Sequence, residues 1–342
     1  MSGNAEWLAQ VIEDPIDPEI PICDPHHHLW EFRNERVWHR YLMDEIQADL
    51  KSGHNITSTV FIECGAMYKR TGPPELRVIG ETEFVNGVAA MSASGLYGET
   101  RVCAGIIGNA DFCLGSPVAA VLEAHEAAGG GRFRGIRHQA AWDAASDHIP
   151  IGRNVRGPHT YMDPKFREGF AELVKRDYSF EALVYHPQMP ELLDLARTFP
   201  NARIVLNHFG CPLGIGPYAG KQAEIFTVWK EQLRALSECP NVVAKLGGLV
   251  MELNGFGFHE QPRPPTSAEL ADATKDYYEH TLDCFGVERC MFESNFPVDK
   301  VSASYTVIWN SFQRLAANYS AAEKAALFHD NAVAFYRLDE TA

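Results

Sequence analysis

Short apolar segments alternate with longer amphipathic segments along most of this chain. The short segments are rich in β-branched residues, which is typical of buried strands, whereas the longer ones repeat apolar positions every three or four residues, as helices do. Eight segments of the first kind are predicted to be strands, and they end near residue 28 or cover 59–63, 102–107, 133–138, 180–186, 202–208, 242–246 and 289–295.

Segments of helical period follow these predicted strands one by one. Pro164 directly after Asp163, and a capping box from Thr266 to Glu269, mark the starts of two of them. The predicted helices cover roughly 40–51, 75–95, 116–128, 164–177, 189–199, 220–238, 267–285 and 304–316, and short helices are expected over 320–338.

This order of elements predicts the fold. Eight strand-then-helix units imply a parallel sheet covered on both faces, and eight strands are the number that closes a barrel. We therefore predict an α/β protein with a single (β/α)8 TIM barrel at 20–338, preceded by an N-terminal arm at 1–19. The alternative is a doubly wound open sheet. It lacks a Gly-x-Gly-x-x-Gly motif after its first strand, and the glycines at 129–131 precede a strand instead of following one.

Composition and charge limit the class of partner. With 342 residues, 46% of them hydrophobic, the chain has ample material for one large core. The 45 acidic and 30 basic residues give a net charge of −15, so the average field repels nucleic-acid phosphates and anionic lipids. We therefore expect a small-molecule substrate, with no nucleic-acid or membrane partner.

The cysteines and the start of the chain favour a cytoplasmic location. None of the eight cysteines forms a Cys-x-x-Cys pair, and most lie in apolar runs, where a reduced thiol acts as a small hydrophobic residue. The first twenty residues are acidic and have no long apolar core, so we expect no signal peptide. No apolar run approaches the roughly 20 residues needed to span a bilayer.

Three consecutive histidines end the first predicted strand. Because successive side chains on a strand point to opposite faces, His26 and His28 share one face. Such a pair can hold one divalent metal ion, since each neutral ring offers a nitrogen lone pair. The alternatives are a polar surface patch and the hydrogen-bonded mouth of a sheet.

The barrel brings these histidines together with other polar residues. Active sites of such barrels form at the C-terminal ends of the strands, where residues far apart in the sequence converge. The polar residues at the predicted strand ends are His26, His28, Glu63, Arg137, His138, His186, His208, Lys245, Glu293 and Asn295.

Several motifs carry a resemblance to a known family. They are His-x-His at 26–28, Gly-Ile-Arg-His at 135–138, Tyr-His-Pro-Gln at 185–188, Leu-Asn-His-Phe-Gly at 206–210, Lys-Leu-Gly-Gly at 245–248 and Phe-Glu-Ser-Asn-Phe-Pro at 292–297. Over about 20–338 the chain resembles the amidohydrolase superfamily. It is most similar to the amidohydrolase-related branch (amidohydrolase family 2). This branch contains lactonases that act on sugar-acid lactones and on pyrone dicarboxylate. Carboxymuconate-semialdehyde decarboxylases are more distant relatives.

The resemblance implies roles for four histidines. His26, His28 and His186 would bind a divalent metal ion, for which we expect zinc, or would point at the substrate carbonyl in a metal-free member. His208 would hold the attacking water or polarise the carbonyl. Glu63, at another strand end, is either a further catalytic carboxylate or a hydrogen-bond partner of one of these histidines.

Asn295 departs from the superfamily pattern, which has an Asp at this position that binds metal and takes a proton from water. An amide has no titratable proton site, so Asn295 cannot be the general base. Because the usual metal-binding Asp is replaced, a site without a metal ion is an alternative. Glu293 and Asp299 are the candidates for the missing carboxylate. Alternatively, Glu293 forms an internal salt bridge with Lys245 or Arg137, and Asp299 is the N-terminal acid of a helix.

Long loops at the same end are expected to bind the substrate. The connection at 139–164 is unusually long, which is typical of lids and binding loops. Arginines at such a mouth can clamp a carboxylate with two hydrogen bonds, and the alternative is that they only balance an acidic surface. The predicted substrate-binding residues are Arg137, His138, Trp142, Arg153, Arg156, Tyr161 and Lys245, among which Trp142 and Tyr161 would supply flat apolar walls.

Together these features predict a hydrolase that opens a lactone of a small, carboxylate-bearing substrate. His208 and one carboxylate, Glu293 or Asp299, would orient and deprotonate water while the metal ion polarises the carbonyl. The alternatives are a non-oxidative decarboxylase of an aromatic or unsaturated acid and a catalytically weak barrel that binds a small acid. The apolar surface at 309–315 would suit a homodimer, and a buried core face explains it equally well.

Overall fold

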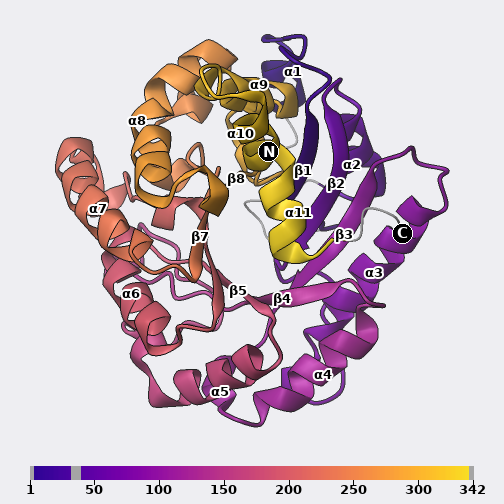
Figure 1. Ribbon diagram of the computed structural model, residues 1–342, viewed down its shortest axis with the longest axis vertical. Coiled ribbons are helices and arrows are strands. Elements are labelled where there is room, and N and C mark those ends of the chain that lie inside the picture. Colours follow the sequence, from indigo (N-terminus) through magenta and orange to yellow (C-terminus); the bar gives the residue numbers. More distant parts are fainter. Residues whose placement is uncertain (1–3, 32–39, 339–342) are drawn as a thin grey trace.

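In the computed structural model, which describes residues 4–31 and 40–338, eight parallel strands follow one another in sequence order around a barrel (Figure 1). Just beyond the ends of the first and last strands, a hydrogen bond from His28 N to Phe296 O (2.8 Å) joins the two sides of the barrel. The predicted (β/α)8 barrel is therefore confirmed. The strands are β1 (Pro21–His27), β2 (Asn55–Ile62), β3 (Arg101–Gly108), β4 (Phe133–Arg137), β5 (Ser179–Ala182), β6 (Arg203–Leu206), β7 (Val242–Leu246) and β8 (Cys290–Phe292).

Helices cover the outside of this barrel close to the predicted ranges (Figure 1). As predicted, Pro164 lies in the first turn of one helix and a capping box from Thr266 to Glu269 begins another, and the Asp163 side chain caps the first of these. The helix predicted from residue 75 begins at Ile79, because a 3-10 turn (Pro74–Leu76) occupies its start. The helices are α1 (Asn4–Leu8), α2 (Met43–Leu50), α3 (Ile79–Ala93), α4 (Val118–Ala128), α5 (Pro164–Lys175), α6 (Met189–Thr198), α7 (Gln222–Ser237), α8 (Ser267–Phe285), α9 (Tyr305–Leu315), α10 (Ala321–Ala325) and α11 (Asn331–Tyr336).

Three strands end two or more residues earlier than predicted, and polar residues follow them in short turns. β5 ends at Ala182, β6 at Leu206 and β8 at Phe292. Further along, the backbones of His208 and Asn295 have positive φ angles of 49° and 53°. Such φ angles lie far from those of regular strands, and the chain has left the sheet where these polar side chains begin.

The C-terminal helix α11 closes the opposite end of the barrel. Asn331 Nδ2 donates a hydrogen bond to Cys290 O at the start of β8 (2.8 Å), and Arg203 at the start of β6 donates to Phe335 O. In Figure 1, α11 (yellow) lies across the barrel opening. The buried cluster inside the barrel joins this helix to the strands and contains Cys23, Val60, Ile62, Ala104, Ile107, Met291, Ala332, Tyr336 and Leu338.

The N-terminal arm lies against helix α9. Ile16 N donates a hydrogen bond to Asn310 Oδ1 (3.0 Å), and residues 1–3 of the predicted arm lie outside the described residues. Most of α9 is buried, so packing within the chain accounts for the apolar surface at 309–315.

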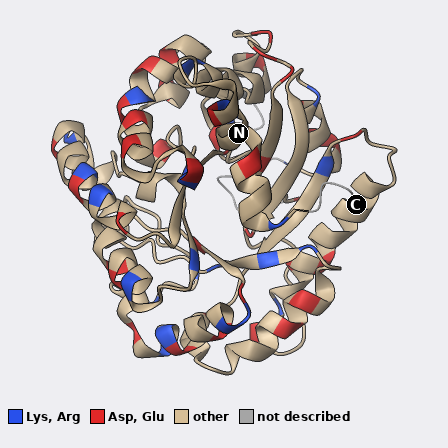
Figure 2. Ribbon diagram, viewed as in Figure 1, with Lys and Arg blue, Asp and Glu red and all other residues tan. Residues whose placement is uncertain are grey.

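Charged residues of both signs are spread along the outer helices (Figure 2). Among the described residues, no helix is both long enough and apolar enough to cross a membrane. Several charged residues are fully buried, among them Glu181, Lys245 and Glu293. Because an unpaired buried charge is strongly destabilising, each of them needs a partner there.

Candidate active site

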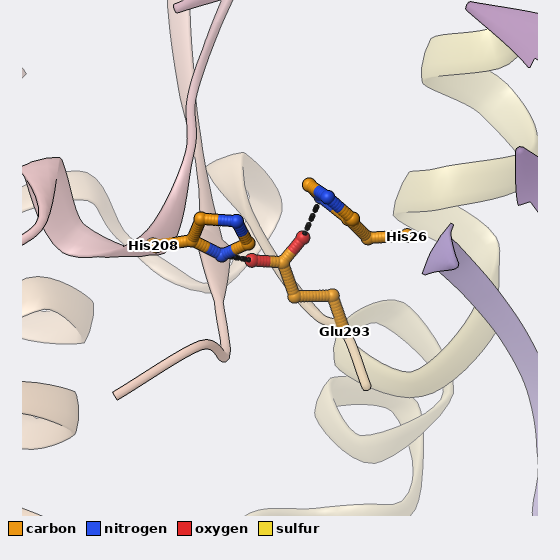
Figure 3. A group of neighbouring side chains, drawn as sticks. All are labelled: His26, His208 and Glu293. Atoms are coloured by element: carbon orange, nitrogen blue, oxygen red, sulfur yellow. Dashed lines mark ion pairs between the residues drawn. The ribbon is translucent and has the colours of Figure 1, made fainter. Parts of the chain in front are cut away.

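The carboxylate of Glu293 lies between the imidazole rings of His26 and His208 (Figure 3). Its Oε2 is 2.6 Å from His26 Nδ1, and its Oε1 is 2.6 Å from His208 Nδ1. His26 lies near the end of β1, and the other two residues follow β6 and β8. The structure thus brings together three predicted site residues at the C-terminal end of the barrel, and none of them is more than 3% exposed.

Two glycines after β7 make room for this arrangement. A Cβ atom at Gly248 would lie 2.3 Å from His208 Nδ1, and one at Gly247 would lie 2.5 Å from Glu293 Cγ. Gly248 also has a φ angle of +79°, which favours glycine. The Lys-Leu-Gly-Gly motif is therefore required by the space around His208 and Glu293.

The three side chains form a donor set that fits a divalent cation. Burial, followed by the charge of Lys245, holds the pKa of His26 well below its usual value, so this ring is neutral and offers a lone pair. Ligand atoms of His26, His208 and Glu293 lie within 4.8 Å of one another. Despite the short contacts, neither Glu293 oxygen has an aligned hydrogen-bond donor among the described residues. Two imidazoles and a carboxylate are also a ligand set of catalytic zinc sites.

His28 and His186, the other two predicted metal ligands, lie outside this group of three. His28 Nδ1 is 2.8 Å from a backbone carbonyl oxygen of β2, and its ring centroid is 5.0 Å from that of His26. His186 Nδ1 accepts a hydrogen bond from Leu213 N (3.2 Å), and burial lowers the pKa of His186 to about 4. Their role as metal ligands stays a prediction, and the geometry favours Glu293 as the third ligand.

Asn295 is linked to the second candidate carboxylate. Its Nδ2 donates a hydrogen bond to Asp299 Oδ1 (2.9 Å), and Asp299 is 2% exposed. Burial, with an added contribution from the charge of Glu293, raises the pKa of Asp299 well above its usual value, although the hydrogen bond from Asn295 opposes this rise. A carboxylate with a raised pKa is a better proton acceptor near neutral pH than an ordinary one. Asp299 is therefore a candidate for the base that Asn295 cannot be.

Two of the predicted substrate-binding arginines are paired with Glu63. Arg137 Nε donates to Glu63 Oε1 and Arg153 Nη1 donates to Glu63 Oε2, both at 2.8 Å. Although burial acts in the opposite direction, Arg153 and Arg137 lower the pKa of Glu63. This cluster borders the candidate site, because Arg137 Nη1 lies 3.4 Å from His26 Nε2. Glu63 is thus the partner of two arginines rather than of a histidine.

Four other predicted substrate-binding residues lie in the wall and loop beyond β4. His138 Nδ1 accepts a hydrogen bond from a backbone N–H (3.1 Å), and the fully buried Tyr161 donates its hydroxyl to His138 O (3.1 Å). Trp142 is half-buried, and Arg156 is exposed and paired with an aspartate carboxylate (2.5 Å). These contacts brace the long loop, and the binding of substrate by these four residues stays a prediction.

Three buried residues beneath the site, Glu181, Asn207 and Tyr336, are absent from the sequence-based prediction. Lys245 is fully buried and pairs with Glu181 (3.0 Å), and its binding of substrate stays a prediction. A signal for Glu181 exists in the sequence, because a charged residue inside an apolar strand requires a buried partner. That partner is not local, since Glu181 also binds Tyr336, which lies 155 residues away.

Comparisons with known proteins agree with this architecture. The family model of the amidohydrolases matches residues 23–338. An uncharacterized protein from Sinorhizobium fredii is 34% identical over 340 residues, covering 94% of this chain and 99% of that protein. L-fucono-1,5-lactonase from Burkholderia multivorans is 31% identical over 214 residues, covering 62% of this chain and 66% of that enzyme.

One solved structure extends the likeness to a metal-bound protein. The crystal structure of an amidohydrolase from Burkholderia multivorans with bound zinc matches with a TM-score of 0.72 and 25% sequence identity, over 93% of this chain and 99% of that one. The resemblance carried by the strand-end motifs is therefore confirmed.

Proposed function

This chain belongs to the amidohydrolase family, and we propose that it hydrolyses a lactone at the C-terminal mouth of its barrel. The observation that carries the proposal is the placement of Glu293 between His26 and His208 in a relative of an L-fucono-1,5-lactonase. Lactone hydrolysis needs a polarised carbonyl, an oriented water molecule and a proton acceptor. The residues around this carboxylate can meet these needs.

His26, His208 and Glu293 would hold a divalent cation, for which we propose zinc. When bound, such an ion supplies a Lewis acid that polarises the ester carbonyl and makes water more acidic. The proposal is supported by the neutral His26 ring, by the short and unaligned contacts of Glu293, and by the zinc bound in the similar amidohydrolase.

Asp299 would take the proton from the attacking water. Glu293 lies between two imidazoles, whereas Asp299 is a nearby carboxyl with a raised pKa whose Oδ1 is held in place by Asn295. When the ring opens, the protonated Asp299 would return this proton to the leaving alkoxide, so the base is regenerated in each turnover. The Arg137 guanidinium borders the other edge of the His26 ring, with Nη1 3.4 Å from Nε2.

The substrate would be the lactone of a small polyhydroxylated acid, in line with the name of the fuconolactonase relative. The arginines predicted to clamp a substrate carboxylate already bind carboxylates of the chain, which weakens their pull on a further anion. A carboxylate-bearing lactone is the second candidate. It is favoured by the two positive charges of Arg137 and Arg153, which face the single negative charge of Glu63.

The test is turnover by the zinc-loaded protein of L-fucono-1,5-lactone and of a pyrone dicarboxylate. Ring opening is followed by proton release and by mass spectrometry of the product, against the rate without enzyme. We expect saturable hydrolysis with the gain of one water, and a loss of about a hundredfold or more in kcat in Asp299→Asn. Carbon dioxide release without water incorporation would instead identify a decarboxylase. Saturable binding without turnover would identify a small-acid binding barrel.

A further inference from the structure

A buried carboxylate beneath the candidate active site, Glu181, joins several elements of the barrel. Its Oε2 accepts a hydrogen bond from Asn207 Nδ2 (2.5 Å) and lies 3.0 Å from Lys245 Nζ, while its Oε1 accepts one from the hydroxyl of Tyr336. None of these four residues is more than 1% exposed. Side chains from β5, β7, the end of β6 and helix α11 therefore meet at one carboxylate.

Two partners of Glu181 lead directly to the two histidines. Asn207 immediately precedes His208, whose positive φ angle (49°) is held in a non-glycine residue only where the surroundings impose it. Lys245 Nζ donates to the carbonyl oxygen of the residue before His26 (2.7 Å) and lies 3.5 Å from His26 Nδ1. Glu181 thus restrains the backbone just before His26 and His208, the two rings that flank Glu293.

Lys245 also connects Glu181 to Glu293, because its Nζ is 3.9 Å from Glu293 Oε2. Two buried carboxylates therefore share one ammonium group. Burial and the charge of Glu181 hold the pKa of Tyr336 well above its usual value, so this hydroxyl remains a donor to Glu181. If Tyr336 or Asn207 stopped donating, Glu181 would draw Lys245 more strongly and move it away from Glu293.

We infer that Glu181 is a positioning residue of the active site, acting through Lys245 and Asn207, and that Tyr336 makes helix α11 part of this support. The inference rests on the proposed function, since it concerns the same site. Glu181 sets the spacing of His26 and His208 about Glu293. It therefore sets the affinity of the site for a divalent cation and the rate of the step that depends on that geometry.

The test compares Tyr336→Phe with a matched substitution, Tyr41→Phe. The Tyr41 hydroxyl donates to Asp49 (2.8 Å), which also pairs with Lys300 (2.7 Å). The Lys300 ammonium lies 5.5 Å from the centroid of the Tyr41 ring, as the Lys245 ammonium lies 5.2 Å from that of Tyr336. Each substitution therefore removes one hydroxyl from a carboxylate that a lysine also binds. The control is stringent because the affected lysine is also next to the candidate site: Lys300 directly follows Asp299 in the sequence.

Zinc affinity of the metal-free protein is measured by competition with a chromophoric chelator, and lactone turnover is measured on the zinc-loaded protein. In Tyr336→Phe we expect the zinc affinity to fall by about three- to tenfold and kcat to fall by about tenfold, with KM within about twofold. Tyr41→Phe is expected to change neither zinc affinity nor kcat by more than about twofold. It should lower the unfolding temperature by about as much as Tyr336→Phe does. Equal effects of the two substitutions on affinity and kcat would overturn the inference.

Glu181→Gln tests the same inference without relying on one hydroxyl. We expect a larger loss of zinc affinity and kcat than in Tyr336→Phe, and no further loss when the two are combined, because Tyr336 acts through Glu181. Losses that multiply in the double variant would contradict the inference. Zinc affinity needs no substrate, so a wild-type protein that binds zinc and opens no lactone refutes the proposed function alone. A wild-type protein with neither zinc binding nor turnover overturns both.

Discussion

Asn295 Nδ2 donates a hydrogen bond to Asp299 Oδ1 (2.9 Å). The resemblance implies an Asp at position 295, and the amide found there instead binds the carboxylate of Asp299 in the following turn. Burial raises the pKa of Asp299, and this hydrogen bond opposes the rise. In the proposed function this pair separates two tasks that a single Asp would combine. Asn295 would provide orientation, and Asp299 would provide the proton acceptor.

Asn295→Ala is expected to move the pH dependence of catalysis. Removing the hydrogen bond raises the pKa of Asp299 further, because that bond favours the charged carboxylate. Since the base works only when deprotonated, the acidic limb of the kcat profile should shift to higher pH. The measurement is kcat against pH at saturating lactone. An acidic limb that stays in place, in a variant with unchanged zinc content, would show that Asp299 is not the base.

Single alanine substitutions distinguish the ligand set that we propose from the geometry from the one that the resemblance implies. We expect His26→Ala and His208→Ala to lower the zinc affinity by more than about a hundredfold, which exceeds the typical effect of indirect partners. His28→Ala and His186→Ala should retain most of the bound zinc, because their nitrogen atoms lie outside the group around Glu293. Zinc content is measured by plasma mass spectrometry. Loss of zinc in His186→Ala would instead restore the ligand set implied by the resemblance.

The barrel and the centre of its site could be predicted from the sequence because both depend on repeated, local patterns. The alternation of strand and helix recurs eight times, and polar residues at nearly every predicted strand end are visible in the sequence. The rule that strand ends converge then brings His26, His208 and Glu293 together without any knowledge of their contacts.

The partners of individual site residues could not be predicted from the sequence, because they depend on contacts between residues far apart in the chain. Arg153 and Glu63 are 90 residues apart, and their ion pair leaves fewer free positive charges at the mouth than the sequence suggests. Whether a histidine at a strand end joins the site depends on how the backbone leaves the sheet. Both His208 and His186 begin 3-10 turns. His208 has a positive φ angle and its Nδ1 faces Glu293, whereas the Nδ1 atom of His186 accepts a backbone N–H.

Glu81 of α3 is expected to make the stability of the protein depend on pH. Its Oε1 accepts hydrogen bonds from Cys64 N (3.0 Å) and Ala66 N (2.8 Å). Burial, with the charge of Glu63, raises the pKa of Glu81 from 4.5 to about 7. Between these values the folded protein keeps a proton that the unfolded chain has lost. The contribution of Glu81 to the free energy of unfolding therefore falls as the pH rises through this window.

Glu81→Gln should remove this dependence, since an amide oxygen can accept the same two backbone N–H groups without a titratable charge. We expect the free energy of unfolding of the variant to exceed that of the wild type by up to about 3 kcal/mol at alkaline pH and to match it closely at acidic pH. Urea unfolding at about pH 5 and about pH 8 measures the difference. Glu83→Gln is the control, because Glu83 is exposed and pairs with Lys69. An equal gain in both variants would contradict the role of the buried carboxyl.

Gly248→Ala tests whether the space beside His208 is required for the site. A methyl group there would lie 2.3 Å from His208 Nδ1, and the φ angle of +79° adds backbone strain. Gly131 separates the two effects. It has a φ angle of +81°, and beyond its chain neighbours no atom of the described residues would lie within 4 Å of a methyl group on it. Both alanine variants are expected to lose about 1 kcal/mol of unfolding free energy from the backbone.

Of these two variants, Gly248→Ala alone should also lose zinc affinity and kcat, each by more than about tenfold, since His208 must move away from Glu293 to accommodate the methyl group. Chelator competition and steady-state kinetics on both variants measure these losses. Should Gly248→Ala behave like Gly131→Ala in both assays, His208 would be free to shift without consequence. The close contact between Glu293 and the two histidines would then not be the arrangement on which catalysis depends.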